Sequence, residues 1–509
     1  MKKKNYEIEF FIYLIIFLLV FYCRLGYWDT IQIGDNADEI MQLLAGREIL
    51  EGKIPYLDFY EPKTTIAFIP HILANLFENP YMGLRFIGTA ILLVSAILIK
   101  NQATKLFGRD IAFLLSILFI VLNSTERYQQ VSLSLISSVF LLSISYILLN
   151  QKISNYQYLL LGFFISVLCL IRLNFYPISI GVFFIIYFLI EKKYFIKKIF
   201  FICCGATIPI IAFIYPYLII NNGNEIIFNY IISLFNRGGD FNFIWNLREI
   251  TRYLLVSIIS PIFVITFFII TTGLSYSKKK YLIIQALFLL SFLSILTIKS
   301  SIYQFQNFFP YMILSFGIFL KEINIEKPLI KDSIFHKTSL VYRNFKIIII
   351  LCLLIPVVFT STIVNVKSIL NKTEFNQFDR LKYNLNRAAI KNLKKIINER
   401  DTLYSTQNFF YLSLNKDLIH PMLFFNNFSS LGEFGLTNIP GIKYYDNKNH
   451  GSKELLNILR TKKPTWIILS TDFFDKESSN EYKNFVKKNW SFENTINAKQ
   501  KYYLFKIKN

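Results

Sequence analysis

Long apolar runs, separated by short polar segments, repeat along roughly the first 370 residues of this 509-residue chain. Most are about 15–22 residues long, close to the length at which a helix crosses the hydrocarbon core of a bilayer. About eleven can be delimited, at residues 8–23, 82–99, 110–123, 131–149, 157–171, 175–190, 199–220, 252–273, 281–298, 303–320 and 345–366. The pattern predicts a polytopic α-helical membrane protein with about eleven transmembrane helices, give or take one.

The pattern changes beyond about residue 370. Residues 370–400 have the spacing of a basic amphipathic helix and residues 452–462 that of a second helix, whereas 465–471 and 501–507 are typical of β-strands. We therefore expect a transmembrane module over residues 1–366 and a small soluble α/β domain over residues 367–509.

Composition agrees with a membrane protein. Hydrophobic residues make up 54% of the chain and aromatic residues 17%, and the mean hydropathy is +0.42, all outside the usual range of soluble domains. The first run follows three lysines and has no small-residue cleavage site, which favours an uncleaved signal anchor. The five cysteines lie in or at the ends of apolar runs, without the Cys/His spacing of a zinc site. No nucleic-acid motif or internal repeat is visible.

The charges predict which side of the membrane each segment faces. If the N-terminus is cytoplasmic, the inward segments (2–9, 100–109, 150–156, 191–198, 274–280 and 321–346) together carry 20 Lys and Arg. The outward loop 24–81 carries four basic residues and nine acidic ones. Because basic residues concentrate on the cytoplasmic side, we expect this loop to be extracytoplasmic. After eleven crossings the C-terminal domain is expected on the same side.

The C-terminal domain is itself basic. Residues 367–509 contain 24 bases and 13 acids. This excess indicates either a solvated basic face or a surface that attracts anionic lipid or phosphorylated glycan. The sequence leaves both interpretations open.

The acidic strip of the outward loop, "GDNADEIMQLLAGREILEGKIPYLDFYEPKTT" (34–65), contains a helix start. Asn36 fits an N-cap, Glu39 its capping-box partner, and Asp38 lies in the first turn, where the helix dipole favours a carboxylate. Gly52 and then Pro55 are expected to end the helix. Capping alone explains the two acids, so their pattern does not by itself indicate catalysis.

A chemical interpretation joins the acids to nearby cations. Glycosyl transfer from a lipid-phosphate sugar needs a carboxylate to accept a proton or hold a divalent ion, and cations to neutralise the departing phosphate. Lys63, Arg85 and Arg172 are all expected near the outer face, and Lys299 is a weaker candidate of the same kind. Arg172 equally fits a short-turn charge that snorkels to the headgroups. Arg237 and Asp240, in the second outward loop (221–251), could line a substrate cleft, but their pattern favours a solvated turn.

The strip also resembles the first external loop of bacterial GT-C glycosyltransferases of the dolichyl-phosphate-mannose protein mannosyltransferase type, a superfamily that includes lipid A aminoarabinose transferases. The family pattern is Asp-Glu, an amphipathic helix ending in Leu-x-Gly, Pro-Tyr-x-Asp, and Lys-Pro-Pro. Asp38-Glu39, "ILEG" (49–52), "PYLD" (55–58) and Lys63 match it in order. Thr64-Thr65 replace the two prolines, which puts the local backbone shape in question.

Three later stretches resemble the family more weakly. "NPYMGLRFIG" (79–88) is similar to the segment in which an Arg opens the second membrane helix. "LIRLNFYPI" (170–178) is similar to a basic site between later helices. "YQFQNFFPYMIL" (303–314) resembles a Tyr- and Pro-rich late helix but lacks the His or Arg often found there.

The resemblance implies a multi-pass enzyme of the bacterial plasma membrane, with a cytoplasmic N-terminus, that moves a sugar with inversion from a polyprenyl-phosphate donor to a lipid, glycan or protein acceptor. Such an enzyme is a hexosyl- or pentosyltransferase. Asp38 is the expected base, supported by Glu39, and the two are candidate ligands for Mg²⁺ or Mn²⁺, although no cofactor is certain. Lys63, Arg85, Arg172 and Lys299 would bind the donor phosphate. Weaker candidates for the substrate cleft are Asp35, Tyr56, Asp58, Asn174, Arg237 and Asp240.

Two other classes remain open. A polyprenyl-linked glycan polymerase or ligase is also polytopic with large outer loops, but would more naturally carry basic residues in a late loop. A transporter would be favoured by repeat symmetry and discontinuous helices, and neither is evident.

Overall fold

The computed structural model describes residues 2–25, 37–55, 58–59, 63–123, 131–150, 152–190, 194–220, 223–224, 227–228, 278–296, 306–324, 388–405, 408–417, 438–439, 442–443, 456–471, 473–497 and 501–508. The chain divides into two compact units. Unit 1 comprises Met1–Arg24, Gly88–Ala212 and Asp240–Ile369, and unit 2 comprises Leu25–Ile87, Phe213–Gly239 and Leu370–Asn509. The acidic loop thus belongs to the same unit as the C-terminal segment.

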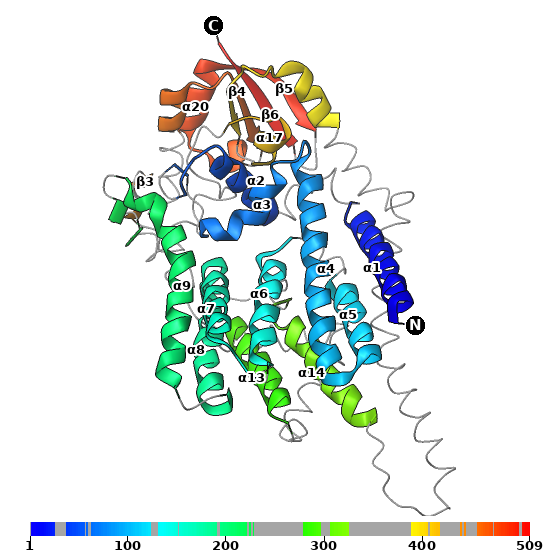
Figure 1. The fold of residues 1–509 in the computed structure, drawn as a ribbon. Coiled ribbons are helices and arrows are strands. Elements are labelled where there is room, and N and C mark those ends of the chain that lie inside the picture. Colours follow the sequence, from blue (N-terminus) through cyan, green and yellow to red (C-terminus); the bar gives the residue numbers. More distant parts are fainter. Residues whose placement is uncertain are drawn as a thin grey trace, which may run out of the picture. The chain divides into compact units, whose positions relative to one another are not determined.

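Unit 1 is a helical bundle (Figure 1). Its described helices are α1 (Lys2–Leu25), most of α4 (Pro80–Phe107), α5 (Arg109–Asn123), α6 (Leu133–Leu148), α7 (Asn155–Ile171), α8 (Tyr176–Ile185), most of α9 (Phe195–Leu218), α13 (Lys279–Leu296) and α14 (Phe309–Asn324). Short helical segments η3 (Leu173–Phe175) and η4 (Ile186–Ile190) flank α8. Neighbouring pairs in the bundle include α6 with α7, α8 with α13, α13 with α14, and α14 with α5.

Small residues let two of these helices approach closely. A Cβ atom added at Gly162 of α7 would lie 1.9 Å from the Ile202 carbonyl oxygen of α9, and one added at Gly205 of α9 would lie 1.9 Å from the Leu159 oxygen of α7. Each glycine therefore accommodates the backbone of the other helix, which is a usual way for membrane helices to pack. Buried hydrogen bonds add to this packing elsewhere, such as Tyr311 Oη of α14 to the Leu141 oxygen of α6 at 2.6 Å.

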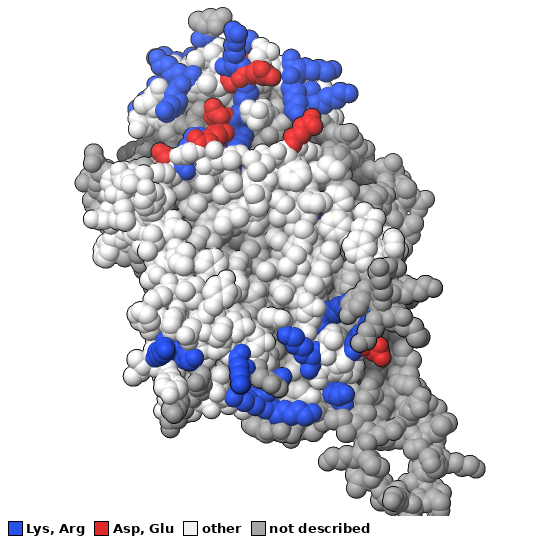
Figure 2. All heavy atoms as spheres, in the orientation of Figure 1, with Lys and Arg blue, Asp and Glu red and all other residues white. Residues whose placement is uncertain are grey.

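The outer surface of unit 1 is apolar. Many large apolar side chains are exposed there. Examples are Phe10 of α1 (65% exposed), Phe188 of η4 (71%) and Ile196 of α9 (84%). In Figure 2 the described Lys and Arg of this unit gather at one end, and its remaining surface in view is uncharged. A large continuous apolar surface of this kind requires an apolar environment, which a bilayer provides.

Helix length alone does not give the number of crossings. Within the described residues, α4 and α9 are long and apolar enough to span a membrane, and other apolar helices have 10–17 residues. The predicted runs at 252–273 and 345–366 lie outside the described residues, and the other runs fall on helices. The count of about eleven therefore stays a prediction.

Unit 2 contains a four-stranded sheet with the order β1-β4-β6-β5. The strands are β1 (Leu403–Ser405), β4 (Trp466–Ser470), β5 (Trp490–Asn497) and β6 (Lys501–Ile507). β1 pairs with β4 in parallel, and the other pairs are antiparallel. β4 and β6 lie where the sequence predicts strands. A separate two-stranded ribbon joins β2 (Asn438–Ile439) to β3 (Ile442–Lys443).

Helices cover both faces of this sheet. On one face, alternate strand residues such as Trp466 and Ile468 pack against α2 (Ala37–Leu50), α17 (Asn408–Ser413) and a helix over 388–396. On the other, Ile467 and Leu469 pack against a helix over 456–462 and α20 (Asn480–Asn489). Successive side chains of a strand point to opposite faces, so the fully buried pattern of β4 follows from cover on both sides.

The helix over 388–396 bears out the predicted amphipathic pattern. Ala389, Leu393 and Ile397 recur every four residues and are buried in the sheet core, whereas Lys391, Lys394 and Lys395 are exposed. This is the spacing expected for one apolar stripe on a helix. Residues 370–387, the first part of the predicted helix, lie outside the described residues.

Candidate active site

The acidic strip folds as the helix that the sequence predicts. α2 begins at Ala37 and ends at Leu50, and Gly52 takes φ = +88°, the left-handed conformation that glycine adopts most readily. The Gly52 amide donates to the Ile49 oxygen and the Lys53 amide to the Glu48 oxygen, each at 3.0 Å. These two bonds form a Schellman cap, which fixes where the chain leaves the helix. Asn36, the predicted N-cap, lies outside the described residues.

Glu39 and Arg85 form a buried ion pair. Arg85 Nη1 and Nη2 donate to the two carboxylate oxygens of Glu39 at 2.5 and 2.7 Å, and the residues are only 7% and 4% exposed. Two parallel charge-assisted bonds fix both orientation and distance. The pair therefore joins the first turn of α2 to the first turns of α4.

His71, which the sequence reasoning missed, lies beside this pair. It is fully buried on α3 (Ile69–Ala74). Burial, opposed by the negative charge of Glu39 and reinforced by the positive charge of Lys63, lowers the pKa of His71 to about 3. The imidazole is thus neutral at physiological pH. We call Glu39, Lys63, His71 and Arg85 the Glu39 cluster. The sequence feature that could have indicated this residue is a single His in the apolar stretch that follows Lys63.

Close packing of α2 against α3 positions His71. A Cβ atom added at Gly46 of α2 would lie 2.7 Å from the His71 carbonyl carbon. Asn75 Nδ2 donates to the Leu43 oxygen of α2 and to the His71 oxygen, both at 2.8 Å. Because Gly46 has no side chain, α2 and α3 can approach closely, and the side-chain amide of Asn75 links the two helices by hydrogen bonds.

The threonine that replaces the first proline of the family pattern keeps a proline-like backbone. Thr64 has φ = −72° and ψ = 156° and precedes the 3₁₀ helix η1 (Thr65–Phe68). Proline restricts φ to about −65°, so this conformation is one that proline also adopts. The substitution at this position therefore leaves the local chain direction compatible with the family pattern.

A second group of charges attaches α2 to the C-terminal segment. Arg47 Nη2 donates to the Lys416 oxygen at 2.6 Å, while the Glu48 carboxylate, 1% exposed, accepts from Arg47 and Lys53. Lys416 in turn donates to three backbone oxygens, of Asn398, Glu399 and Asp401. The acidic helix is thus held on the sheet of unit 2 by polar contacts as well as by its apolar face.

The remaining site candidates divide between the units. Asp58, exposed in unit 2, accepts from the Ile54 amide at 2.7 Å and closes a local turn. In unit 1, Arg172 follows α7 and its Nη1 donates to Ser134 Oγ at 3.2 Å. Asn174, 5% exposed, donates to the Ser294 oxygen at 3.2 Å. Asp35, Tyr56, Arg237, Asp240 and Lys299 lie outside the described residues, as does the side chain of Asp38 on α2.

The predicted metal ligands are only partly described. Among the residues that the structure describes, no group of three His, Cys, Asp or Glu side chains could hold a metal ion. Glu39 already faces the guanidinium of Arg85, whose positive charge disfavours a second cation there. Glu39 is therefore a poor candidate for a metal ligand while this pair is formed.

No protein-family model matches the chain, and no curated protein matches it.

Comparison of the fold with solved structures does find similar proteins. ArnT from Cupriavidus metallidurans in the apo state is 10% identical, with 99% of this chain and 98% of that chain covered and a TM-score of 0.57. The same protein bound to undecaprenyl phosphate is 11% identical, with 97% of each chain covered and a TM-score of 0.60. An oligosaccharyltransferase from Archaeoglobus fulgidus is 8% identical, covering 96% of this chain and 72% of that chain, but its TM-score of 0.46 is too low to support a common fold.

ArnT is a lipid A aminoarabinose transferase of the GT-C superfamily, the superfamily that the acidic strip resembles. Its similarity to this chain extends over nearly the full length of both proteins. The chain therefore shares the fold of ArnT.

Proposed function

We propose that this protein is an integral-membrane glycosyltransferase that moves a sugar from a polyprenyl-phosphate donor to a lipid, glycan or protein acceptor on the extracytoplasmic face. The observation that carries the proposal is that a chain with the fold of ArnT holds the acidic strip in a defined geometry, with Glu39 paired to Arg85. A structure of ArnT is bound to undecaprenyl phosphate, which supports a donor of that class.

The proposed chemistry is a displacement with inversion. The acceptor oxygen attacks the anomeric carbon while the bond from that carbon to the donor phosphate breaks, and the electron pair leaves with the phosphate oxygen. Asp38 takes the proton of an acceptor hydroxyl. If the acceptor oxygen already belongs to a phosphate, no proton needs removal and Asp38 orients the acceptor or holds a divalent ion instead.

The Glu39 cluster would position this base. Asp38 adjoins Glu39 in the first turn of α2, and the two bonds from Arg85 fix that turn. Lys63, Arg172 and Lys299 are the proposed cations for the donor phosphate, whose growing negative charge they would stabilise. Because the guanidinium of Arg85 already binds Glu39, we propose that Arg85 mainly positions Glu39 and only secondarily contacts the donor phosphate.

The C-terminal segment would serve as the support of the acidic loop. α2 packs with its apolar face on the same sheet face as α17 and the helix over 388–396, and Arg47 attaches it to the Lys416 carbonyl. An extracytoplasmic position for this unit follows the charge asymmetry of the sequence. Capping the cleft or recruiting the acceptor are compatible additional roles.

A deletion strain that lacks this protein would distinguish a transferase from a polymerase or ligase and from a transporter. A transferase predicts that polyprenyl-phosphate-linked monosaccharide accumulates and that one surface lipid, glycan or protein loses a single sugar by mass spectrometry. Loss of polymer length with accumulation of lipid-linked oligosaccharide would instead indicate a polymerase or ligase. Unchanged glycans and an altered distribution of lipid between the leaflets would indicate a transporter.

A further inference from the structure

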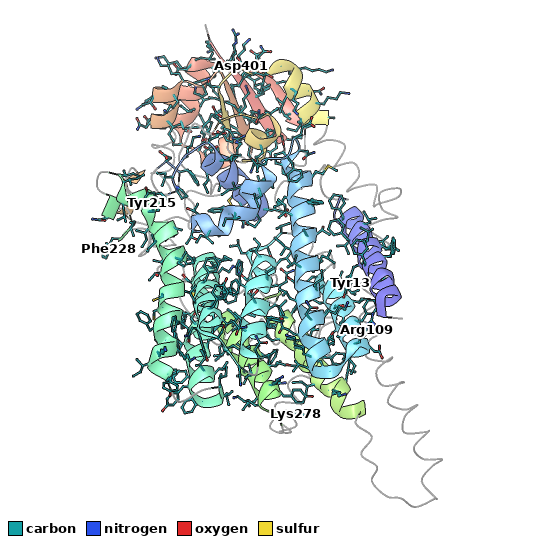
Figure 3. The ribbon with its side chains drawn as sticks, viewed as in Figure 1. Tyr13, Arg109, Tyr215, Phe228, Lys278 and Asp401 are labelled. Atoms are coloured by element: carbon teal, nitrogen blue, oxygen red, sulfur yellow. The ribbon has the colours of Figure 1, made fainter. Side chains whose placement is uncertain are left out.

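A hollow of about 570 Å³ lies at one end of unit 1. Four lysines line it: Lys105 at the end of α4, and Lys278, Lys279 and Lys280 at the start of α13. Figure 3 marks Lys278 at the end of the bundle where α13 begins. These lysines come from two of the segments with the cytoplasmic charge bias, 100–109 and 274–280. None of the described residues that line the hollow carries a carboxylate.

Three of these ammonium groups contact neutral groups. Lys105 Nζ donates to Tyr146 Oη at 3.1 Å and lies 4.2 Å from the centre of that ring. Lys278 has the same two contacts with Tyr281, at 3.3 and 4.8 Å, and Lys279 Nζ donates to the Ile190 oxygen at 3.4 Å. Aromatic rings and carbonyl oxygens orient an ammonium group without cancelling its charge, so these contacts leave the hollow positive.

One helix end adds to this preference for anions, although the C-terminal ends of α4 and α6, which carry a partial negative charge, line the same hollow. The first turn of α13, an 18-residue helix, forms part of the wall, and the N-terminal end of a helix carries a partial positive charge. Ammonium groups together with a helix N-terminus favour a phosphate group over other common anions, because phosphate accepts many hydrogen bonds and carries a concentrated charge.

Apart from Asn150 and Tyr281, the rest of the wall is apolar. Leu106, Leu148, Leu149, Ile190 and Ile283 line the same hollow, and the bundle has an apolar outer surface. A ligand with a phosphate and adjoining hydrocarbon matches both kinds of surface. Basic pockets between membrane helices on the cytoplasmic side have this character when they bind anionic headgroups.

We propose that this hollow is a phosphate-binding site and that it takes the headgroup of an anionic phospholipid. The site is independent of the Glu39 cluster, and none of its residues has a role in the proposed transfer. Bound lipid would fasten the ends of α4, α6 and α13 to the leaflet on that side.

The test uses the full-length protein in mild detergent with added phosphatidylglycerol, and native mass spectrometry to count the lipid retained. Lys105→Gln/Lys279→Gln should weaken retention by roughly thirtyfold, since each lysine at a membrane surface contributes roughly fivefold. The matched control is Lys152→Gln/Lys197→Gln, which removes the same charge from exposed lysines outside the hollow and should change retention less than about threefold. Lys105→Arg/Lys279→Arg should restore binding.

Competition with inorganic phosphate distinguishes a lipid headgroup from free phosphate as the ligand of this site. If millimolar phosphate fails to displace the lipid, the occupant is a lipid headgroup, and if it displaces the lipid through the same lysines, free phosphate also occupies the site. The proposal is overturned if the wild-type protein retains neither probe, or if the variant in the hollow and its control lose lipid equally.

Discussion

Arg85 donates hydrogen bonds to both carboxylate oxygens of Glu39, at 2.5 and 2.7 Å. The two residues are 46 positions apart in the sequence, and both side chains are buried. The acidic helix and the second long helix are thereby joined at one point, next to the residue proposed as the base. A buried pair of this kind does little for stability compared with apolar residues of the same shape, but losing one partner leaves a buried charge unpaired.

Glu39→Gln or Arg85→Met alone should therefore destabilise unit 2 by about 3–5 kcal/mol. Unfolding in mild detergent, followed by the fluorescence of Trp466 and Trp490, measures this, because both tryptophans are buried in that unit. The double variant should recover part of the loss, because neither charge then remains unpaired. Equal stability of Glu39→Gln and the wild-type protein would show that the pair does not hold α2 in place.

Two glycines of the same strip should respond differently to alanine. At Gly46 alanine improves helix propensity by about 1 kcal/mol, yet its Cβ would meet the His71 backbone at 2.7 Å. We expect a net loss of stability, because backbone atoms of α3 would have to move.

At Gly52 nothing lies within 4 Å of an added Cβ, but φ is +88°. Gly52→Ala should cost about 1 kcal/mol from backbone strain alone. The same fluorescence measurement compares the two variants. A gain in stability for Gly46→Ala would contradict the close contact between α2 and α3.

Acid should destabilise unit 2 through His71. Its pKa in the folded protein is about 3, below the ordinary value of 6.5, so between these values the unfolded chain binds a proton that the folded protein does not. The stabilisation is complete above pH 6.5 and is lost as the pH falls toward 3, by about 2 kcal/mol at pH 5.

His71→Gln should flatten this dependence when the free energy of unfolding is measured from pH 7.5 to pH 5. An identical slope in the variant and the wild-type protein would mean that the pKa of His71 is not lowered in the folded protein, contrary to its burial in the Glu39 cluster.

Local patterns made several of these elements predictable. The helix start, Gly52 and the short apolar runs of β4 and β6 all act through neighbours in sequence, so α2 and these two strands lie where the sequence predicts them. The pairing of Glu39 with Arg85 and the burial of His71 could not be predicted in this way, because they depend on how α2, α3 and α4 meet. The same holds for the attachment of α2 to the C-terminal sheet, through Arg47 and a carbonyl 369 positions away.

The resemblance to a family indicated a chemical function, which the hydrophobic periodicity of the sequence does not. Capping explains Asp38 and Glu39 equally well, and only the order of Asp-Glu, "ILEG", "PYLD" and Lys63 pointed to a glycosyltransferase. The fold that the chain shares with ArnT agrees with that interpretation. At Thr64, the first of the two replaced positions, the backbone has a conformation that proline also adopts.

The central claim is that the acidic strip carries the transfer reaction, and Asp38→Asn tests it most directly. The variant and a matched control, Glu78→Gln at an exposed acid of the same loop, are each produced in cells that lack the protein. Membrane insertion is verified, and the surface glycoconjugates and polyprenyl-phosphate sugars are measured by mass spectrometry. We predict that Glu78→Gln restores the missing sugar, whereas Asp38→Asn inserts normally but lowers transfer by roughly a hundredfold or more. Full restoration by Asp38→Asn would contradict the claim.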